Sequence, residues 1–335
     1  MKISENNLSI IVINYNGASS LQECIQSIAG QLENEDELIL IDNNSDDNSK
    51  IIMMQEFKNN DCIQRFFLDE NLGISRGRNL GAKKARHDLL MFIDSDLVLN
   101  PYSVKNARET MSKKTDAITG EYFDIGEGYA WFNELKRNAF SRKRKNTKNI
   151  QISNSNYFTF SGGLCVIRKE IYCFFNGFNC AFDKGSAEDI DFEFKLLNSN
   201  KVILLEKDFR GIHKKGHVSI ESVIKSAKNN GIGVANLLKS AKKNKYIVSF
   251  NRYYPKIPLI HILLLLSIIF LFIHIAIFYL VFAIIIFSYY SPIFIAKGKL
   301  KHKFMALYIL PFTDTIWLYF ILKQLSAVNK TGRFS

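Results

Sequence analysis

The sequence predicts an α/β fold with a mostly parallel sheet flanked by helices, followed by membrane helices toward the C-terminal end. Three observations lead to this prediction. Short apolar, β-branched runs alternate with stretches of helical spacing over the first 100 residues. Several of these runs end in acidic residues. Near the C-terminal end, residues 257–296 contain no Asp, Glu, Lys or Arg.

The alternation of strands and helices is clearest in the first 100 residues, where runs rich in Ile, Val and Leu indicate strands. Strands are expected at 8–14, 37–41, 62–68 and 88–93, and helices at 19–31, 50–58 and 75–86. Further along the chain, a helix is expected at 188–197 and a strand at 202–205. Strands that alternate with helices form a largely parallel sheet, and ligands bind beyond the carboxyl ends of its strands.

An acidic pair, Asp94 and Asp96, follows the fourth expected strand, with Ser95 between them. In an extended backbone, alternate side chains point to the same side, so we expect the two carboxylates together and the serine turned away. Two like charges need a cation or hydrogen-bond donors beside them. Because Mg²⁺ and Mn²⁺ prefer carboxylate oxygens, the pair suggests a divalent cation that also binds phosphate. The alternative is a solvated acidic turn.

Composition and charge narrow the class of protein. The chain has 335 residues, of which 47% are hydrophobic and 23% charged, as in folded proteins. Its five cysteines form no CxxC pair, which argues against a disulfide framework or zinc ribbon and indicates a reducing compartment. The net charge of +12 comes from residues 101–335, because residues 1–100 are acidic. A basic region indicates a phosphate-containing or anionic membrane partner, and the apolar C-terminal run decides against nucleic acid.

The uncharged run at 257–296 is too long and too apolar for a soluble core helix, so it predicts a membrane segment. As helix it would span about 60 Å, roughly twice a hydrocarbon core, so a hairpin fits as well as one tilted helix. Basic residues flank both ends, and the positive-inside rule then favours a hairpin with both ends in the cytoplasm. A further apolar segment, 304–322, contains Pro311 and Asp314 and would span, re-enter or lie at the interface.

Seven short motifs follow one another in a specific order. They are SIIVINYNG (9–17), LILIDNNSDDNS (38–49), NLGISRGRNLGAKKA (71–85), FIDSD (92–96), SGG (161–163), GFNCAF (177–182) and AEDIDFEFKL (187–196). Through these motifs the chain resembles the family 2 glycosyltransferases over about residues 8–217. The resemblance implies a GT-A fold, a Rossmann-like domain that binds nucleotide sugars.

The resemblance also implies contacts to the donor and its divalent cation. Donor contacts are implied for Asn14, Asp42, Arg78, Asn79, Asp94, Ser95 and Asp96. Asp42 would reach the nucleobase or ribose, or only cap the turn that follows it. Arg78 would pair with phosphate or orient Asp94, unless it is an exposed helical arginine. The cation, Mn²⁺ or Mg²⁺, would be held by Asp94, Asp96 and His213.

The motif at 187–196 implies the catalytic base. An attacking hydroxyl must lose its proton, and a carboxylate within reach can take it. The resemblance makes Asp189 the base of an inverting single displacement, with Glu188 and Asp191 positioning Asp189 or the acceptor. Alternatively, or at the same time, these acids belong to a capping box that begins at Ser186. The segment Ser161-Gly162-Gly163 lacks side-chain bulk, so the backbone could approach the sugar or acceptor closely there.

The expected organisation is a catalytic domain followed by membrane-associated segments. The domain covers 1–217, with a donor-nucleotide half at 1–100 and an acceptor half at 101–217. It is followed by a basic amphipathic linker at 218–256, a membrane segment at 257–325 and a tail at 326–335. A helix beginning near residue 220 would lie in the headgroup plane or pack on the domain as a basic helix. The polar first seven residues are no secretory signal, so the domain is expected in the cytoplasm.

Three functions remain open. The first is a bacterial hexosyl- or deoxyhexosyltransferase (EC 2.4) anchored in the plasma membrane. It would move a sugar from a UDP- or dTDP-type donor to a hydroxyl of a lipid-linked or growing cell-surface glycan. The second is transfer to polyprenyl phosphate, an acceptor that is already an anion and needs little help from a base. The third is a non-catalytic membrane protein that binds nucleotide sugars.

Overall fold

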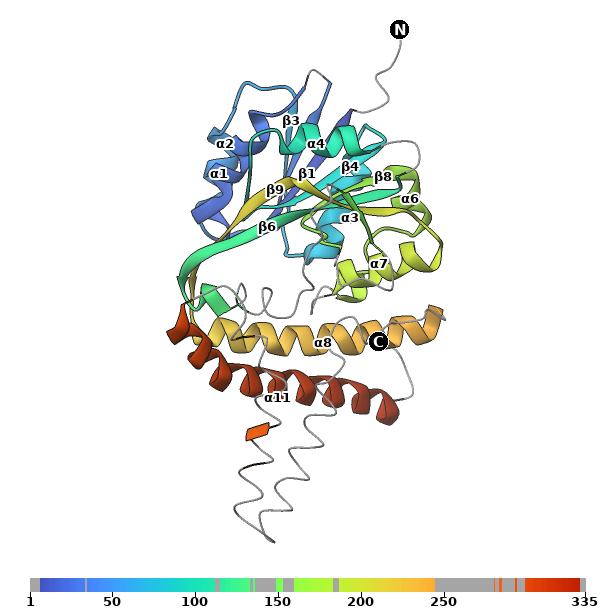
Figure 1. Cartoon of the computed structure of the whole chain (residues 1–335). Helices are drawn as coiled ribbons and strands as arrows, with labels where there is room; N and C mark the ends of the chain where they lie inside the picture. The colour runs from blue at the N-terminus through green and yellow to red at the C-terminus, as the bar shows by residue number, and fades with distance from the viewer. Residues whose placement is uncertain are drawn as a thin grey trace.

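The computed structural model shows an α/β domain whose sheet lies above two long helices (Figure 1). The described residues are 7–33, 35–111, 115–132, 135, 149–152, 160–182, 187–244, 280, 283, 284, 293 and 299–331.

The first half of the domain is built as the sequence predicts. Its strands are β1 (Leu8–Asn14), β2 (Glu37–Asp42), β3 (Ile63–Phe67) and β4 (Leu89–Asp94), and its helices are α1 (Ala18–Ala29), α2 (Ser49–Gln55) and α3 (Ile74–Lys84). The strands pair in parallel in the order β3-β2-β1-β4. The ends of the elements differ from the predicted ends by a few residues.

The second half adds strands of both directions. Its strands are β5 (Leu97–Leu99), β6 (Ala117–Gly128), β7 (Asn149–Gln151), β8 (Leu164–Arg168) and β9 (Ile203–Val218). Its helices are α4 (Ser103–Thr110), α6 (Lys169–Phe174), the 3-10 helix η1 (Cys180–Phe182) and α7 (Glu188–Asn198). The sheet continues β4-β8-β6-β9-β5, with β8 antiparallel to both neighbours and β7 antiparallel to β9. The sheet is therefore mixed, and the prediction of a mostly parallel sheet holds for the first half.

Strand β9 is much longer than the strand expected at 202–205. It continues to Val218 because it pairs with β6 up to that residue and with β5 at residues 211–213. This pairing brings His213 into the sheet, directly opposite Leu97 on one side and Asp124 on the other.

Apolar side chains cover both faces of the sheet, because successive residues of a buried strand point to opposite faces. On one face, Ile10 and Leu38 belong to a core with α1, α2 and α4. On the other face, Ile11 and Ile39 belong to a core with α3, α6 and α7. Helix α3 lies very close to β1, since a Cβ at Gly81 would be 2.3 Å from Ile11 Cγ2. This close packing fixes the helix that carries Arg78.

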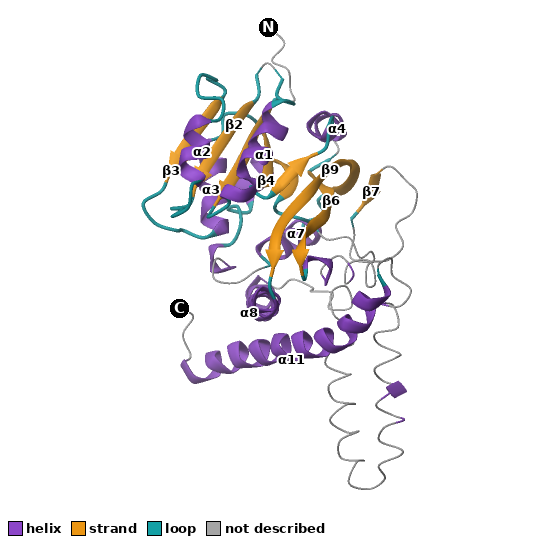
Figure 2. Ribbon diagram, turned by 90° about the vertical axis from the view of Figure 1, so that its left-hand side faces the viewer, coloured by secondary structure: helices purple, strands orange, loops and turns teal. Residues whose placement is uncertain are grey.

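Two long helices lie beside the domain. Helix α8 (Ile220–Asn244) follows β9 and packs on α7 and η1, and α11 (Leu300–Thr331) packs on the other side of α8. Figures 1 and 2 show α11 beneath α8, so that α8 lies between the domain and α11. The helix expected near residue 220 is thus present and is packed on the domain.

Among the described residues, Leu300–Lys323 is the helical stretch that is long and apolar enough to cross a bilayer. Length and composition are the basis of that statement, and a buried helix passes the same test. The hairpin predicted at 257–296 lies outside the described residues, apart from Leu280, Ala283, Ile284 and Ile293.

Candidate active site

The carboxyl ends of β1, β2 and β4 bring the first candidate residues together. Asn14 is the last residue of β1, and the strand register places it opposite Asp42, the last residue of β2. Asp94, the last residue of β4, stands opposite Ile13. Three polar side chains therefore meet at one edge of the parallel part of the sheet, where such folds bind ligands.

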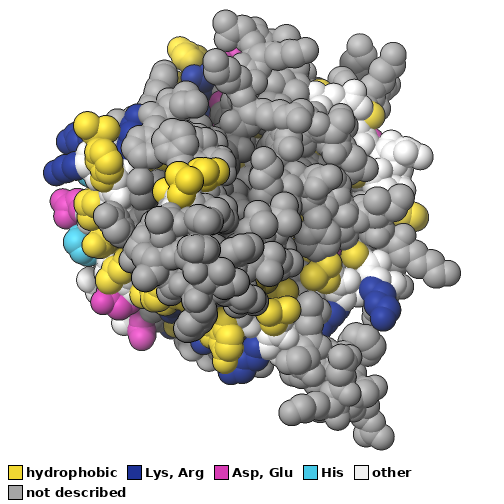
Figure 3. All heavy atoms as spheres, turned by 60° about the horizontal axis from the view of Figure 1, so that its bottom comes forward, with side chains coloured by type: hydrophobic (Ala, Val, Ile, Leu, Met, Phe, Trp, Pro, Cys, Tyr) yellow, Lys and Arg dark blue, Asp and Glu magenta, His cyan; other side chains and the backbone are white. Residues whose placement is uncertain are grey.

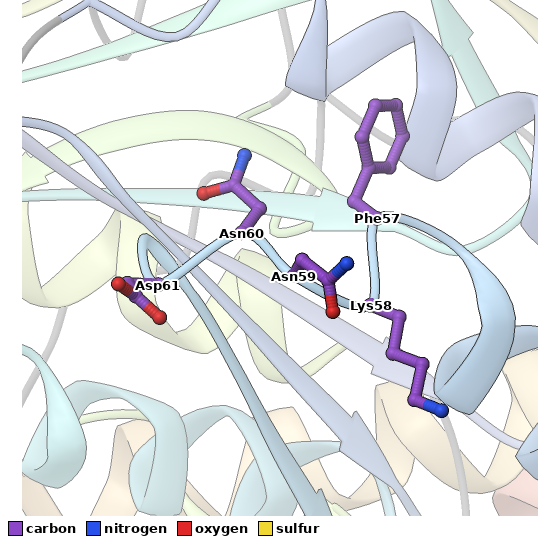
Figure 4. A pocket seen from close by; sticks show the side chains of 5 residues that line it. All are labelled: Phe57, Lys58, Asn59, Asn60 and Asp61. Carbon is purple, nitrogen blue, oxygen red and sulfur yellow. The ribbon is translucent and has the colours of Figure 1, made fainter.

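A surface pocket in the described part of the chain lies elsewhere. Residues Phe57 to Asp61, in the loop before β3, line it (Figure 4). This loop precedes its strand and so lies at the amino ends of the parallel strands, at the opposite edge from Asp42 and Asp94. The pocket contains none of the candidate residues.

Asp42 is completely buried and bound by donors of the chain itself. Asn14 Nδ2 donates to Asp42 Oδ1 over 3.1 Å, and the Ser45 backbone N–H donates to Asp42 Oδ2 over 2.9 Å. Asp42 thus holds the turn that follows β2, as the capping alternative expects. The neighbouring Asn14 Oδ1 is buried and accepts no hydrogen bond from the described residues. A buried acceptor atom without a hydrogen-bond partner among the described residues therefore lies next to Asp42.

Arg78 links the two halves of the domain. Its Nη2 lies 2.6 Å from Asp94 Oδ1, and its Nη1 lies 2.8 Å from Glu188 Oε1. Its side chain is only 4% exposed, which is incompatible with an exposed helical arginine. Burial lowers the pKa of Arg78, but the charges of Asp94 and Glu188 raise it more, so its pKa lies above the usual value. The guanidinium is a fixed positive charge between two carboxylates.

The ion pair with Arg78 also determines the protonation state of Asp94. Burial raises the pKa of Asp94, but the adjacent guanidinium of Arg78 lowers it more, so the net pKa is below its usual value. The Asp94 carboxylate is thus ionised and lies beside the Arg78 guanidinium.

Asn79, the neighbour of Arg78, lies in a different environment. Its Oδ1 accepts hydrogen bonds from the Tyr172 hydroxyl over 2.5 Å and from the Phe178 backbone N–H over 3.0 Å. Its Nδ2 donates to the Phe178 carbonyl over 2.9 Å. Asn79 therefore stabilises the turn at Gly177. The sequence predicts instead that Asn79 contacts the nucleotide sugar.

Asp96 has different hydrogen-bond partners from Asp94. Strand β4 ends at Asp94, and residues 95 and 96 form a turn before β5, so the extended alternation expected for this motif is absent. Ser95 lies toward the start of α1, since its Oγ would be 3.1 Å from a Cβ at Gly17. Asp96 Oδ2 lies 2.7 Å from His213 Nε2.

Behind His213 stands a residue that the sequence interpretation missed. His213 Nδ1 lies 2.9 Å from Asp124 Oδ1 on β6, and Asp124 is 7% exposed. Burial lowers the pKa of His213, but its hydrogen bonds with Asp124 and Asp96 raise it more, so the pKa is above the usual value. No motif marked Asp124, because its role comes from the pairing of β6 with β9.

The predicted metal set of Asp94, Asp96 and His213 is not assembled in the described residues. Within them, no group of three or more His, Cys, Asp or Glu side chains is arranged to hold a metal ion. Asp94 is instead bound by Arg78. Asp96 and His213 still offer a carboxylate oxygen and an imidazole nitrogen side by side. A carboxylate behind a histidine, as Asp124 stands here, is typical of metal-ligating histidines, so these two residues fit a divalent cation.

Helix α7 presents Asp189 and Glu188 to the Arg78 bridge. Asp189 Oδ2 accepts a hydrogen bond of 3.4 Å from the Gly162 backbone N–H. Burial, then the charge of Glu188, raise the pKa of Asp189 to about 7. The residue before the helix, Ala187, has φ of 83° and makes no side-chain capping bond, while Ser186 lies outside the described residues. A carboxyl group with such a pKa changes its protonation near neutral pH.

Asp191 does not join this group. Its carboxylate is completely buried and faces α8, where Ser240 Oγ donates to Asp191 Oδ1 over 2.5 Å. Lys195 Nζ lies 3.1 Å from Asp191 Oδ2. The structure therefore places Asp191 as a link between α7 and α8, and not beside Asp189.

Comparisons with known proteins agree with these observations. Residues 9–175 match the sequence family described as Glycosyl transferase family 2. A 100-residue stretch is 35% identical to the teichoic acid poly(glycerol phosphate) polymerase of Staphylococcus epidermidis, over 30% of this chain and 14% of that protein. Glycosyltransferase GlyG of Streptococcus pneumoniae is 25% identical over 36% of this chain and 40% of that protein. The chain thus spans less than half the length of these relatives.

Solved structures show the same fold. Mannosyltransferase PcManGT from Pyrobaculum calidifontis, in complex with GDP-Man and Mn²⁺, aligns with a TM-score of 0.53 at 12% identity, over 99% of this chain and 77% of that chain. S. aureus TarS 1-349 in complex with UDP-GlcNAc aligns with a TM-score of 0.51 at 16% identity, over 98% and 93%. At such identities the likeness concerns the fold.

Proposed function

We propose, from the premise that the chain is a transferase with a family 2 glycosyltransferase domain of GT-A fold, that it transfers a sugar from a nucleoside-diphosphate sugar to a hydroxyl group with inversion. The observation that carries this proposal is the bridge Asp94–Arg78–Glu188. It joins the strand end that would face the donor to the helix turn that holds Asp189.

In the proposed reaction, the acceptor oxygen forms a bond to the anomeric carbon while the bond from that carbon to the diphosphate breaks. Asp189 takes the proton of the attacking hydroxyl, and the nucleoside diphosphate leaves with the bonding electrons. A base with a pKa of about 7 is well matched to this task near neutral pH. Glu188 and Arg78 would hold the helix turn that carries Asp189.

The leaving diphosphate would bind beside Asp96 and His213. Asp96 and His213 would hold a divalent cation, Mn²⁺ or Mg²⁺, and Asp124 would keep the imidazole oriented. Such a cation neutralises negative charge that develops on the leaving group. PcManGT was crystallised with GDP-Man and Mn²⁺, which supports a metal-assisted nucleotide-sugar site of this kind.

The nucleotide would occupy the edge formed by β1 and β2. Asp42 is already satisfied by Asn14 and Ser45, whereas Asn14 Oδ1 is buried beside it and accepts no hydrogen bond from the part of the chain that the structure describes. A buried acceptor there could bind an N–H group of a nucleobase. The UDP-GlcNAc complex of S. aureus TarS 1-349 supports a UDP- or dTDP-type donor.

The acceptor would be a lipid-linked or growing cell-surface glycan, reached from the cytoplasmic side of a bacterial plasma membrane. The similarity to a teichoic acid polymerase and the apolar C-terminal segments support this setting. A membrane-attached enzyme and a lipid-linked acceptor share one surface, which favours their encounter.

The direct test is donor consumption by the full chain in membranes. A panel of nucleotide sugars is supplied with Mn²⁺ or Mg²⁺, and release of the nucleoside diphosphate is measured with and without acceptor lipids. We expect one donor to be consumed, the reaction to stop with excess chelator, and Mn²⁺ or Mg²⁺ to restore it. Asp96→Asn should raise the metal concentration needed for half-maximal rate. Turnover that is unchanged by chelator would contradict the metal site.

Gly163→Ala is expected to lower kcat/KM by about 100-fold, because displacing a catalytic group by about 1 Å costs that much. A Cβ at Gly163 would be 1.9 Å from Asp94 Oδ2, so Asp94 would have to leave its place beside Arg78. Steady-state kinetics and a melting curve check this expectation. Gly30→Ala is the matched control, since its nearest neighbour would be 3.5 Å away. Equal rates for both variants would refute the expectation.

A further inference from the structure

Helix α11 has two unlike faces. Phe304, Phe312, Tyr319 and Leu322 are each more than half exposed. At 100° per residue these four side chains fall within about 80° of one another, so they form one stripe along the helix. We call these four residues the apolar stripe. The buried residues of α11 lie on the other side of the helix: Ala306, Leu310, Thr313, Asp314 and Ile321.

The buried face of α11 is attached to the rest of the protein. Ala306 and Leu310 share an apolar cluster with Val223 of α8 and with Phe132 of the domain. The ring of His302 stacks on Trp131 at a centroid distance of 4.5 Å. Further along, Lys228 Nζ of α8 lies 5.2 Å from the centre of the Phe320 ring. Helix α11 is therefore held along its length and does not leave the domain end-on.

Helix α8 is in turn attached to the catalytic domain. Leu237 packs with Phe182 and Phe194, and Ser240 is hydrogen-bonded to Asp191. The domain, α8 and α11 thus form consecutive layers, as Figures 1 and 2 show. The apolar stripe lies on the side of α11 that faces away from α8.

This layering conflicts with a path of α11 across a bilayer. If α11 spanned the hydrocarbon core, α8 would enter it too, together with the exposed Lys225, Lys228 and Lys242. A lysine side chain at mid-membrane is strongly unfavourable. The 32 residues of α11 also extend about 48 Å, well beyond a core of about 30 Å. A helix lying in the membrane plane avoids both costs.

The charges beside the apolar stripe indicate which surface it meets. Lys299 and Lys301 are exposed at the start of α11, Lys303 is half-buried, and Lys323 is exposed near the far end. Figure 3 shows hydrophobic side chains exposed on the underside of the molecule, with Lys and Arg as well as Asp and Glu side chains beside them. Aromatic residues with flanking lysines suit the boundary between headgroups and acyl chains of an anionic bilayer.

We propose that α11 lies flat in the headgroup region of an anionic bilayer, with the apolar stripe in the acyl boundary and α8 as the spacer that carries the catalytic domain. This inference rests on the proposed membrane attachment but not on the transfer reaction. It assigns the segment at 304–322 to the interface and not to a span.

Depth measurements on the full chain test this orientation. Single cysteines replace Phe304, Phe312, Tyr319 and Leu322 in turn, in a background with Cys62, Cys173 and Cys180 changed to Ser. Each is labelled with an environment-sensitive fluorophore in phosphatidylethanolamine–phosphatidylglycerol vesicles, and lipid-borne quenchers at two depths report its position. Asn59→Cys, in the loop of Figure 4, is the water-exposed control.

We expect all four labels at one shallow depth, while the label at residue 59 stays in water. A graded series with residue 312 deepest would show a span and overturn the inference. Labels in water on protein that still floats with the vesicles would also overturn it. Disulfide crosslinks between the unlabelled single cysteines of two molecules would show that a second copy covers the stripe, which would overturn it as well. Protein that does not float at all would refute the membrane attachment itself. Lys299→Glu with Lys301→Glu should move the label at residue 304 toward water while flotation persists.

Discussion

Replacing Asp189 with Asn is expected to lower kcat by roughly 10²- to 10⁴-fold, the usual contribution of a general base. The amide has nearly the same shape but cannot accept a proton from the acceptor hydroxyl. Asn keeps one oxygen that accepts a backbone hydrogen bond, from Gly162 or from Ile190, and the Arg78 bridge to Glu188 does not depend on the charge of Asp189. Donor binding and folding should therefore persist, which calorimetry with the nucleotide and a melting curve would show.

Asp191→Asn is the informative comparison, because Asp191 lies on the same helix but faces α8. This substitution weakens the ion pair with Lys195, so it should lower stability while kcat changes less than tenfold at a temperature where the protein is folded. If the two variants lose kcat equally and both stay folded, the assignment of the base to Asp189 fails. If Asp189→Asn retains the rate of the native protein, the acceptor is better explained as one that is already an anion, such as polyprenyl phosphate, because such an acceptor needs little help from a base.

The pKa of Asp189 gives this prediction a pH dependence. The base works in its ionised form, and its pKa is about 7. We expect kcat/KM of the native protein to fall about tenfold per pH unit below 7 and to level off above it. The residual kcat/KM of Asp189→Asn should not show this fall below pH 7.

Stability should respond to pH in the opposite direction to that of most acidic groups. A folded-state pKa above the unfolded value means that the folded protein holds the proton more tightly. The contribution of Asp189 to stability is then full below its unfolded pKa and is lost as the pH rises to about 7. Urea unfolding of the native protein and of Asp189→Asn across this range would measure the difference.

Arg78→Met is expected to abolish transfer and to lower the free energy of unfolding by about 3 kcal/mol. The substitution leaves the carboxylates of Asp94 and Glu188 facing each other without the charge that compensates them, and such losses cost 3–5 kcal/mol. We place the effect at the lower end because the Asp94 side chain is 38% exposed.

Two further arginine variants make this expectation specific. Arg76 lies exposed on the same helix, so Arg76→Met should change stability by less than about 0.5 kcal/mol. Arg78→Lys keeps the charge but not the two-pronged geometry, so it should restore part of the stability and little of the rate. Arg78→Met with the stability and turnover of the native protein would disprove the role of the bridge.

The fold of the first half could be predicted because each buried strand there carries its own local signal. Runs such as residues 8–14 and 37–42 are almost uniformly apolar, and they end in the polar residues Asn14 and Asp42. The order of the motifs likewise predicts that Arg78, Asp94 and Glu188 belong to one active site. Their direct contact joins residues that are 110 positions apart, and only the folded sheet reveals it.

The remaining contacts depend on pairings between distant strands and helices. Asp124 stands behind His213 because β6 pairs with β9, and β6 has no regular alternation that would have marked it. Asp191 turns away from Asp189 because Ser240 of α8 is there to bind it. The spacing of the acidic residues on α7 contains no information about α8.

The contact between Ser240 and Asp191 bears on how the protein should be prepared. A shortened version that stops after β9 would lack α8, so Asp191 would lose its hydroxyl donor and Phe182 and Phe194 would lose Leu237. The first turn of α7, which holds Asp189, would then rest on water instead of on a neighbouring helix. Rates measured on such a fragment would describe a loosened enzyme, and the intact chain is the unit whose catalysis can be interpreted.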